Sequence, residues 1–532
     1  MQVESIEERL YLNPAPIIAN FKKCLNTAIS VDKSGLLRYL NRFIDTQDRY
    51  ICLSRPRRFG KTWAATMAAA YYSTGHDTRD LFRGLNICAD PTFDKHLNKY
   101  NVIFINVQNF LSNRQNIKSM IAKITRELLE DLKLAYPEPK IVSRDLIKTL
   151  YNVHKHSNAG FIFIIDEWDC IFRVRPHDSE GQKVYLDFLR LLFKDQSYVQ
   201  LAYMTGILPI KKYGTHSALN MFNEFSMSNP GLFGEFIGFT EYEAKALFEG
   251  ANMSFAKARE WYDGYIFKNI HVYNPLSVVR AVNMQNFANY WNQTETFEAL
   301  KMPISLNFRG LKDAVLKLLS MESVGIDIAT FQNDMSTFSS ADDVLTLLVH
   351  LGYLAFDSSK SEVSIPNNEI REEFKNAVKS ASWGGVSKLL QASQQLLEDT
   401  WSLNAQRIGA AIEEAHNESA SVLKYNDENS LCCVITIAYY AANEHYIIFR
   451  ELASGKGFID LLFLPKAYHF DKPALLIELK WDKTANGAVA QIKDKNYPQK
   501  VLEYTGNIIL VGVNYDKETK THSCAIELLN KD

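Results

Sequence analysis

The sequence lacks the features that mark membrane proteins, secreted proteins and zinc-finger proteins. No apolar run approaches the ~18 residues that a membrane span needs. The opening MQVESIEERLYL has neither the basic nor the apolar region of a secretory signal. The seven cysteines form no Cys-x-x-Cys pair and have no histidine at zinc-ligand spacing. We therefore expect reduced core thiols, no structural zinc, no membrane partner and a cytoplasmic location.

A surplus of basic charge is also missing. Lysine and arginine number 59 against 61 acidic residues, for a formal net charge of −2, so a nucleic-acid-binding surface could only be local. The 532 residues exceed what one hydrophobic core usually supports, and the 47% hydrophobic content is ordinary for globular proteins. The sequence therefore predicts several globular domains.

Short apolar runs alternate with helical patterns through the N-terminal half, which is typical of an α/β fold with a parallel sheet. The third run, FIFII, suits a strand that is buried on both faces. A helix is predicted at Ile117–Leu134 after the second strand. The predicted strands are Tyr50–Ser54, Val102–Val107, Phe161–Ile165 and Leu201–Leu208.

Beyond Gly238 the pattern becomes helical and predicts an all-helical lid, with Thr240 as an N-cap and Glu243 three residues on. Within Val344–Val378 a helix, two short strands and another helix fit a winged-helix-like unit. The predicted domains are an ATPase-like domain at 1–237, the lid at 238–303, the winged-helix-like unit at 304–380, a linker at 381–398 and a last α/β domain at 399–532.

A phosphate-binding loop follows the first predicted strand. The run RPRRFGKT matches G-x-x-x-x-G-K-[ST] except that Arg55 stands at the first glycine. Backbone N–H groups can cradle phosphate oxygens, Lys61 can reach the β- and γ-phosphates, and Thr62 can hold Mg²⁺. We predict that ATP contacts Arg55, Arg57, Arg58, Phe59, Gly60, Lys61 and Thr62. Arg57 and Arg58 could equally reach a neighbouring subunit or lie solvated, and no arginine finger stands out.

Two carboxylates end the buried FIFII strand. Asp166 is placed to coordinate Mg²⁺ and Glu167 to orient the attacking water. An isolated acidic pair can also cap a strand at the solvent edge, but the phosphate loop in the same sheet favours the functional interpretation. Thr205, in the fourth strand, could sense the γ-phosphate or be a plain strand-end hydroxyl.

A second set of charged residues lies near the C-terminus. Period-two alternation puts Glu478 and Lys480 on one face of a strand, and Asp460 lies in the strand before it. If the two strands are neighbours, Asp460 and Glu478 can hold Mg²⁺ while Lys480 positions water or stabilises phosphorane charge. Gln491, predicted to open the next helix, and Glu428, at the start of the preceding one, could add metal or phosphate contacts. A surface ion pair is the alternative for Glu478 and Lys480, yet their apolar neighbours disfavour it.

These strings resemble a bacterial family of AAA-ATPase-like proteins fused to a PD-(D/E)XK nuclease domain. The likeness runs through VDKSGLL, LSRPRRFGKT, IIDEWD, WYDGY, YNPLSV, YNDENSL, GKGFIDLLF, LIELKWDK and QIKDKNY. Arginine at the first Walker-A glycine is usual in that family. The motif proline is absent, since Phe458 and Ile459 precede Asp460.

The resemblance implies an AAA-like or STAND-like P-loop NTPase followed by a restriction-endonuclease-like domain. It implies ATP binding through Gly60, Lys61, Thr62 and Asp166 and a nuclease site at Asp460, Glu478, Lys480 and Gln491. The cofactors would be ATP and Mg²⁺, and the partners DNA and further copies of the chain. Phage defence or mobile-element biology follows by analogy only.

The leading functional hypothesis is a DNase regulated by ATP. The alternative is a nucleotide-switched sensor or nucleic-acid-binding scaffold whose nuclease fold does not cut, although a pure scaffold has no need of Glu478 and Lys480. ATP-driven translocation ranks lower, because the sequence shows no second motor domain.

Overall fold

The computed structural model of the chain forms two compact units, Met1–Thr296 with Gly325–Ile370 and Phe297–Val324 with Arg371–Asp532. These units do not coincide with the predicted domain limits, which stay predictions. Among the described residues, no helix has the length and apolar character that crossing a bilayer requires. The structure describes residues 9–111, 116–138, 142–157, 160–210, 212–213, 216–217, 219–291, 300, 303–306, 308–380, 384–419, 428–454, 457–466, 469, 471–494, 501, 507–519 and 521–529.

The first unit contains a parallel five-stranded sheet in the order β2-β3-β4-β1-β7. All residues of β1 and β3 are buried, as expected for strands covered on both faces. The four predicted strands are present, and β7 is an addition that the sequence did not suggest. The strands are β1 (Tyr50–Ser54), β2 (Asn101–Asn106), β3 (Phe161–Asp166), β4 (Val199–Gly206) and β7 (Asn223–Phe225).

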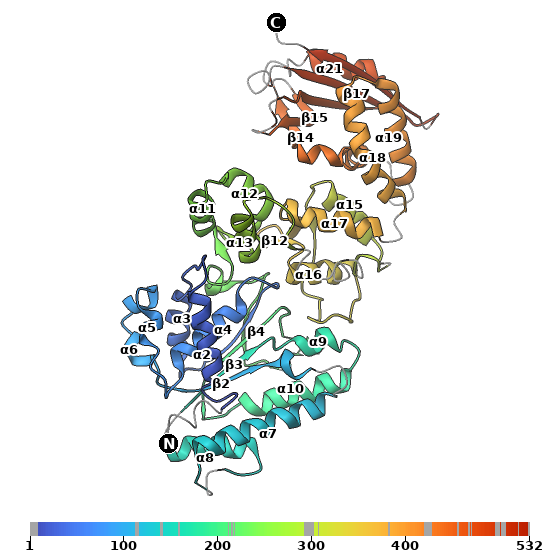
Figure 1. Cartoon of the computed structure of the whole chain (residues 1–532). Coiled ribbons are helices and arrows are strands. Elements are labelled where there is room, and N and C mark those ends of the chain that lie inside the picture. The colour runs from blue at the N-terminus through green and yellow to red at the C-terminus, as the bar shows by residue number, and fades with distance from the viewer. Residues whose placement is uncertain are drawn as a thin grey trace. The chain divides into compact units, whose positions relative to one another are not determined.

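Helices cover both faces of this sheet. The apolar sides of α7 (Ile117–Ala135), α8 (Leu146–Ser157) and α10 (Ser179–Phe193) pack on one face and form the main core (Figure 1). Helix α4 (Lys61–Tyr72) is buried along most of its length and packs on the other face, with α2 (Ala15–Leu25) against it. Functional groups at the carboxyl ends of the strands therefore converge at one edge of a rigid layered scaffold.

Two predicted strands end earlier than expected, for local reasons. Strand β2 stops at Asn106, whose side chain accepts a hydrogen bond from the backbone of Gln108 and caps a 3₁₀ turn. Strand β4 stops at Gly206, because the N–H groups of Ile207 and Leu208 donate to the carboxylate of Asp169 instead of to a strand.

The predicted all-helical lid is wrong in one respect, because it also contains a small antiparallel sheet. Strands β8 (Phe239–Thr240), β10 (Ile270–Tyr273) and β9 (Tyr265–Phe267) pair in that order. Alternating aromatic and β-branched residues on either side of a tight turn explain the β9–β10 hairpin. The helices are α11 (Glu241–Gly250), α12 (Phe255–Tyr262) and α13 (Pro275–Met284), and α11 begins at the predicted Thr240–Glu243 capping box.

The predicted order of helix, two strands and helix follows. It comprises α16 (Ala341–Leu351), β12 (Ala355–Asp357), β13 (Glu362–Ser364) and α17 (Asn368–Ser380), and the short β11 (Val324–Gly325) joins the sheet beside β13. Helix α15 (Leu311–Leu319) precedes this segment. Most of the predicted linker is helical, since α18 spans Gly384–Trp401, a run rich in leucine and glutamine that favours helix.

The second unit contains a five-stranded mixed sheet in the order β14-β15-β16-β17-β18, in which only β16 and β17 are parallel. Helix α21 (Ala485–Asp494) packs on one face and forms an apolar cluster with it. Helix α19 (Ala405–Ser419) contacts β18, and α20 (Glu428–Ala438) contacts β16. The strands are β14 (Tyr446–Ser454), β15 (Gly457–Pro465), β16 (Ala474–Trp481), β17 (Ile508–Asp516) and β18 (Thr521–Leu529).

Candidate active sites

The phosphate-binding loop connects β1 to α4. Gly60, the residue before the helix, has φ +95°, and a Cβ built on it would meet nothing within 4 Å. Its backbone conformation, and not lack of space, therefore explains the glycine. Arg58 also lies in the left-handed region, at φ +65°. The Lys61 side chain is buried and its Nζ donates to the carbonyl of Pro56 at 2.9 Å. Burial lowers the pKa of Lys61, while the nearby carboxylates of Glu167, Asp169 and Asp166 oppose this shift.

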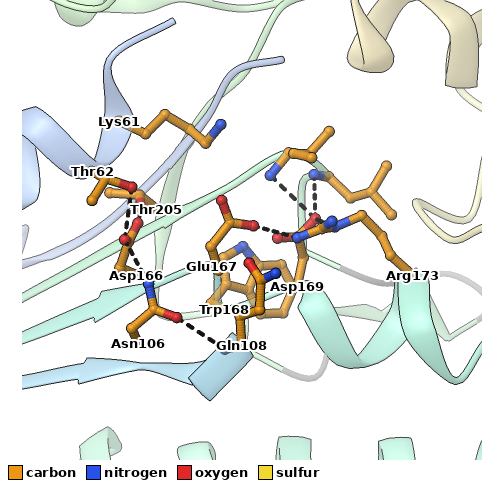
Figure 2. A network of polar contacts seen from close by, with 12 residues as sticks. Lys61, Thr62, Asn106, Gln108, Asp166, Glu167, Trp168, Asp169, Arg173 and Thr205 are labelled. Carbon is orange, nitrogen blue, oxygen red and sulfur yellow. Dashed lines mark hydrogen bonds and ion pairs between the residues drawn. The ribbon is translucent and has the colours of Figure 1, made fainter. Parts of the chain in front are cut away.

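Asp166 lies at the centre of a network that joins three strands and a helix. Its Oδ2 accepts hydrogen bonds from Thr62 Oγ1 at 2.9 Å and from Asn106 Nδ2 at 3.0 Å. Its Oδ1 accepts from Thr205 Oγ1 (Figure 2). The aspartate is fully buried. The structure thus brings together Thr62, Asp166 and Thr205, and adds Asn106, which the sequence did not single out.

The adjacent Glu167 belongs to a separate ion-pair chain. Its carboxylate contacts the Arg173 guanidinium, whose Nε also donates to Asp169 Oδ2 at 3.0 Å. The Asp169 carboxylate in turn accepts the N–H groups of Ile207 and Leu208 at 3.1 and 2.9 Å. Arg173 lies in the short α9 (Cys170–Val174), and the sequence pattern gave no role to it or to Asp169, the last residue of the IIDEWD string.

A cavity of about 520 Å³ opens over the phosphate loop. The side chains of Arg57, Arg58 and Lys61 give it positive charge, and Thr62 and Glu167 also line it. A smaller cavity of about 200 Å³ shares Gly60, Trp63 and Pro275 with the first and is more apolar. Its other lining residues are Cys24, Thr27, Ile29, Ser30, Val31, Lys33, Phe59, Phe236, Gly238 and Phe239.

Two residues predicted to contact ATP do not line the larger cavity. Arg55 is fully buried, and its Nη1 donates to the carbonyls of Ser54 and Phe225 at 2.8 and 3.2 Å. Its guanidinium lies 5.0 Å from the centre of the Phe267 ring, and its backbone N–H donates to Gly206. Burial lowers the pKa of Arg55. Arg55 thus joins the start of the loop to the sheet and the lid.

Phe59 is the second residue that does not line the larger cavity. Its side chain is buried and packs edge-on against Tyr265 of the lid at 5.6 Å between ring centroids. It lines the smaller cavity instead. Arg57 and Arg58 therefore face the larger cavity, whereas the side chains of Arg55 and Phe59 anchor the loop to the sheet and the lid.

The C-terminal residues converge on one face of the mixed sheet. The β15–β16 pairing ends at Leu461 and Ile477, and Asp460 and Glu478 are the next residues of the two strands. The Oδ2 of Asp460 accepts the backbone N–H of Leu479 at 2.7 Å. Antiparallel partners on one face have side chains close enough to share a ligand.

Glu478 is the most enclosed member of this group, with 2% exposure. Its Oε1 accepts a hydrogen bond from Lys480 Nζ at 3.0 Å, as expected for side chains on one face of a strand. The Nε2 of Gln491 donates to the same oxygen. Gln491 lies in the second half of α21, and not at its start as predicted, because the helix already begins at Ala485.

Glu428 begins α20 as predicted, but its side chain lies outside the described part of the structure. Within the described ranges, no group of three or more His, Cys, Asp or Glu side chains gathers at metal-binding distance. The described carboxylates at this site are therefore the pair Asp460 and Glu478.

Comparison with known proteins matches two segments of the chain to family models. Residues 17–215 match the family model described as a predicted AAA-ATPase, and residues 427–524 match that of the PD-(D/E)XK nuclease superfamily. An uncharacterized protein from the vnfD 5' region of Azotobacter chroococcum mcd 1 is 22% identical over 522 residues, which cover 92% of this chain and 93% of the relative.

Two solved structures also align with part of the chain. The Aeropyrum pernix ORC2 protein in its ADPNP-ADP complexes aligns with 70% of this chain and 95% of its own, at 12% identity and a TM-score of 0.26. Cdc6p from Pyrobaculum aerophilum covers 70% of this chain and 99% of its own, at 11% identity and a TM-score of 0.20.

Proposed function

We propose that this chain, which joins an AAA-ATPase-like domain to a PD-(D/E)XK nuclease superfamily domain, is a magnesium-dependent DNase regulated by ATP. The observation that carries the proposal is the convergence of Lys480 and Gln491 on buried Glu478, with Asp460 bonded to the backbone N–H of the adjacent Leu479. A buried carboxylate with a lysine and a glutamine on one oxygen is costly to build for structure alone. A role in phosphodiester hydrolysis would explain why these polar groups are buried together.

The residues of the N-terminal site fit a nucleotide with its metal ion. Lysine and arginine side chains line the larger cavity, which suits a polyphosphate. The hydroxyl of Thr62 and the carboxylate of Asp166 already lie together, and oxygen ligands of this kind suit Mg²⁺. The smaller, more apolar cavity adjoins the loop and suits the nucleobase, with Trp63 between the two spaces.

Each side chain then has a task in the N-terminal site. Lys61 would exchange the Pro56 carbonyl for phosphate oxygens, since its burial makes an anionic partner favourable. Thr62 and Asp166 would hold the ion, and Glu167 would orient the attacking water. Thr205 would hold Asp166 in position through the hydrogen bond that its hydroxyl donates to Oδ1.

The C-terminal site supports hydrolysis of a phosphodiester. Asp460 and Glu478 would hold the divalent ion, and Lys480 would stabilise charge on the phosphate. Gln491 would fix the orientation of Glu478. When bound, Mg²⁺ supplies charge neutralisation at the first site and water activation at the second.

Further copies of this chain are the proposed second partner, and phage defence or mobile-element biology is the proposed setting. The competing proposal is a nucleotide-switched sensor or scaffold that binds nucleic acid without cutting it. Its supporting observation is the small number of described carboxylates at the C-terminal site.

The deciding experiment incubates the purified full chain with Mg²⁺ and labelled DNA, with and without ATP. We expect Lys480→Ala to abolish cutting and Lys61→Ala to remove the effect of ATP. Lys493→Ala is the matched control, because Lys493 lies on α21 and pairs with Glu527 in an exposed ion pair. A parallel RNA substrate tests the choice of nucleic acid. Absence of cutting with every divalent metal and nucleotide would favour the scaffold.

A further inference from the structure

We infer that Arg173 is a positioning residue that sets the orientation of the Glu167 carboxylate for ATP hydrolysis. This inference rests on the proposed ATPase function and extends it to a residue outside the phosphate loop and the strand-end carboxylates. The evidence is a continuous chain of contacts from Glu167 through Arg173 and Asp169 to the backbone after β4.

The arginine is held firmly at its far end. Its side chain is 9% exposed, and Asp169, to which it donates, is fully buried. Asp169 accepts two backbone N–H groups, so its position is set by the backbone directly after β4. Gly206 leaves the necessary room, because a Cβ there would lie 2.7 Å from Asp169 Oδ1. Arg173 cannot swing away without leaving a buried charge uncompensated.

The other end of the chain of contacts reaches the cavity. Glu167 adopts φ +54°, which costs a non-glycine residue about 1–2 kcal/mol. Strain of this kind persists where surrounding contacts fix a side chain that function needs. Figure 2 shows one Glu167 oxygen directed at Arg173 and the other turned to the side of Lys61. Glu167 also lines the larger cavity, so the second oxygen can contact a water molecule there.

Charge supports the same assignment. Burial alone lowers the pKa of Arg173, but the carboxylates of Asp169 and Glu167 more than offset this and hold its pKa above the ordinary value. The guanidinium therefore stays charged at neutral pH. A planar guanidinium that contacts two carboxylates fixes their relative geometry, which a lysine ammonium does less well.

A purely structural role is the alternative, in which Arg173 only neutralises Asp169. The two roles differ in how the effects of substitutions combine. If Arg173 acts through Glu167, its loss has no further effect once the Glu167 carboxylate is gone. If it only stabilises the fold, the two effects add as free energies.

The test measures single-turnover ATP hydrolysis for the wild type, Arg173→Met, Glu167→Gln and the double variant. We expect Arg173→Met to lower the rate about 10- to 100-fold, with nucleotide affinity within about twofold of wild type. The double variant should match Glu167→Gln. Arg173→Lys should recover part of the rate, and it also serves as the second variant should the methionine variant not fold. Arg190→Met is the control, since Arg190 pairs with Asp187 in an exposed pair on α10.

An unchanged rate in Arg173→Met would overturn the inference, and so would effects that multiply in the double variant. If Glu167→Gln abolishes hydrolysis while Arg173→Met leaves the rate unchanged, only the role of Arg173 fails. If the wild type itself hydrolyses no ATP, the proposed ATPase function fails, and this role fails with it.

Discussion

The backbone conformation of Arg58 should lower the stability of the protein, whereas its charge should strengthen nucleotide binding. Replacing Arg58 with glycine should therefore raise stability and weaken binding. The residue has φ +65°, is exposed, and lines the larger cavity over the phosphate loop. A left-handed non-glycine residue costs about 1–2 kcal/mol. Glycine removes that cost but gains about 0.4–1 kcal/mol of unfolded-state entropy. The balance is a gain in unfolding free energy of about 0.5–1 kcal/mol for Arg58→Gly.

The same substitution removes a guanidinium from the nucleotide cavity. A hydrogen bond to a charged group contributes about 1.5–3 kcal/mol, and the exposure of Arg58 favours the lower end. We therefore expect about a tenfold loss of ATP affinity. Trp63 lines both cavities, so its fluorescence can report the titration, and thermal or urea unfolding reports stability.

Gly60→Ala provides the matched opposite. It leaves the charge in place and introduces strain of about 1–2 kcal/mol at φ +95°, of which the lower unfolded-state entropy of alanine offsets about 0.4–1 kcal/mol. It should therefore lower the unfolding free energy by about 0.5–1 kcal/mol even though its methyl group would contact nothing. If Arg58→Gly left ATP affinity unchanged, the reasoning from strain to phosphate binding would be refuted.

Three further substitutions test other parts of the structure. Burial and a neighbouring histidine lower the pKa of His522 to about 4, so the folded state stays neutral while the unfolded state protonates near pH 6.5; stability is lost as the pH falls through this window. Without the histidine this loss should disappear, so His522→Phe should spare about 2 kcal/mol of unfolding free energy at pH 5 and little at pH 7.5, as measured by urea unfolding. An unchanged pH dependence would contradict this prediction. Thr205→Val should slow ATP hydrolysis by removing a donor to Asp166, while unaltered kinetics would make the hydroxyl a bystander. Gly512→Ala places a methyl 2.2 Å from the Ala485 carbonyl, so it should displace α21 and reduce DNA cutting together with thermal stability; retention of both would show that the packing is looser than described.

Residues within one element were predicted well from the sequence. The buried FIFII run and the loop after YICLS predicted β3, β1 and the start of α4, because apolar runs and glycine positions are local signals. Period-two alternation was enough to bring Glu478 and Lys480 together. The likeness to an ATPase–nuclease fusion was confirmed by the two family matches.

Contacts between distant segments were harder to predict. The sequence shows Asp460 in a strand, but only the β15–β16 pairing brings it to the backbone beside Glu478. Arg173 has no motif around it, and its role depends on where α9 turns after β3. Arg55 matched a phosphate-loop position, yet its side chain binds the sheet and the lid, because a buried guanidinium goes where carbonyls and an aromatic ring can solvate it.

The most direct test of the central claim is a crystal structure with Mn²⁺ and a non-hydrolysable ATP analogue, read from the anomalous scattering of manganese. We expect one manganese peak between Asp460 and Glu478 and another beside Thr62 and Asp166. A peak at the second position alone, with the C-terminal carboxylates free of metal at saturating Mn²⁺, would contradict the nuclease proposal and leave only the nucleotide-binding half.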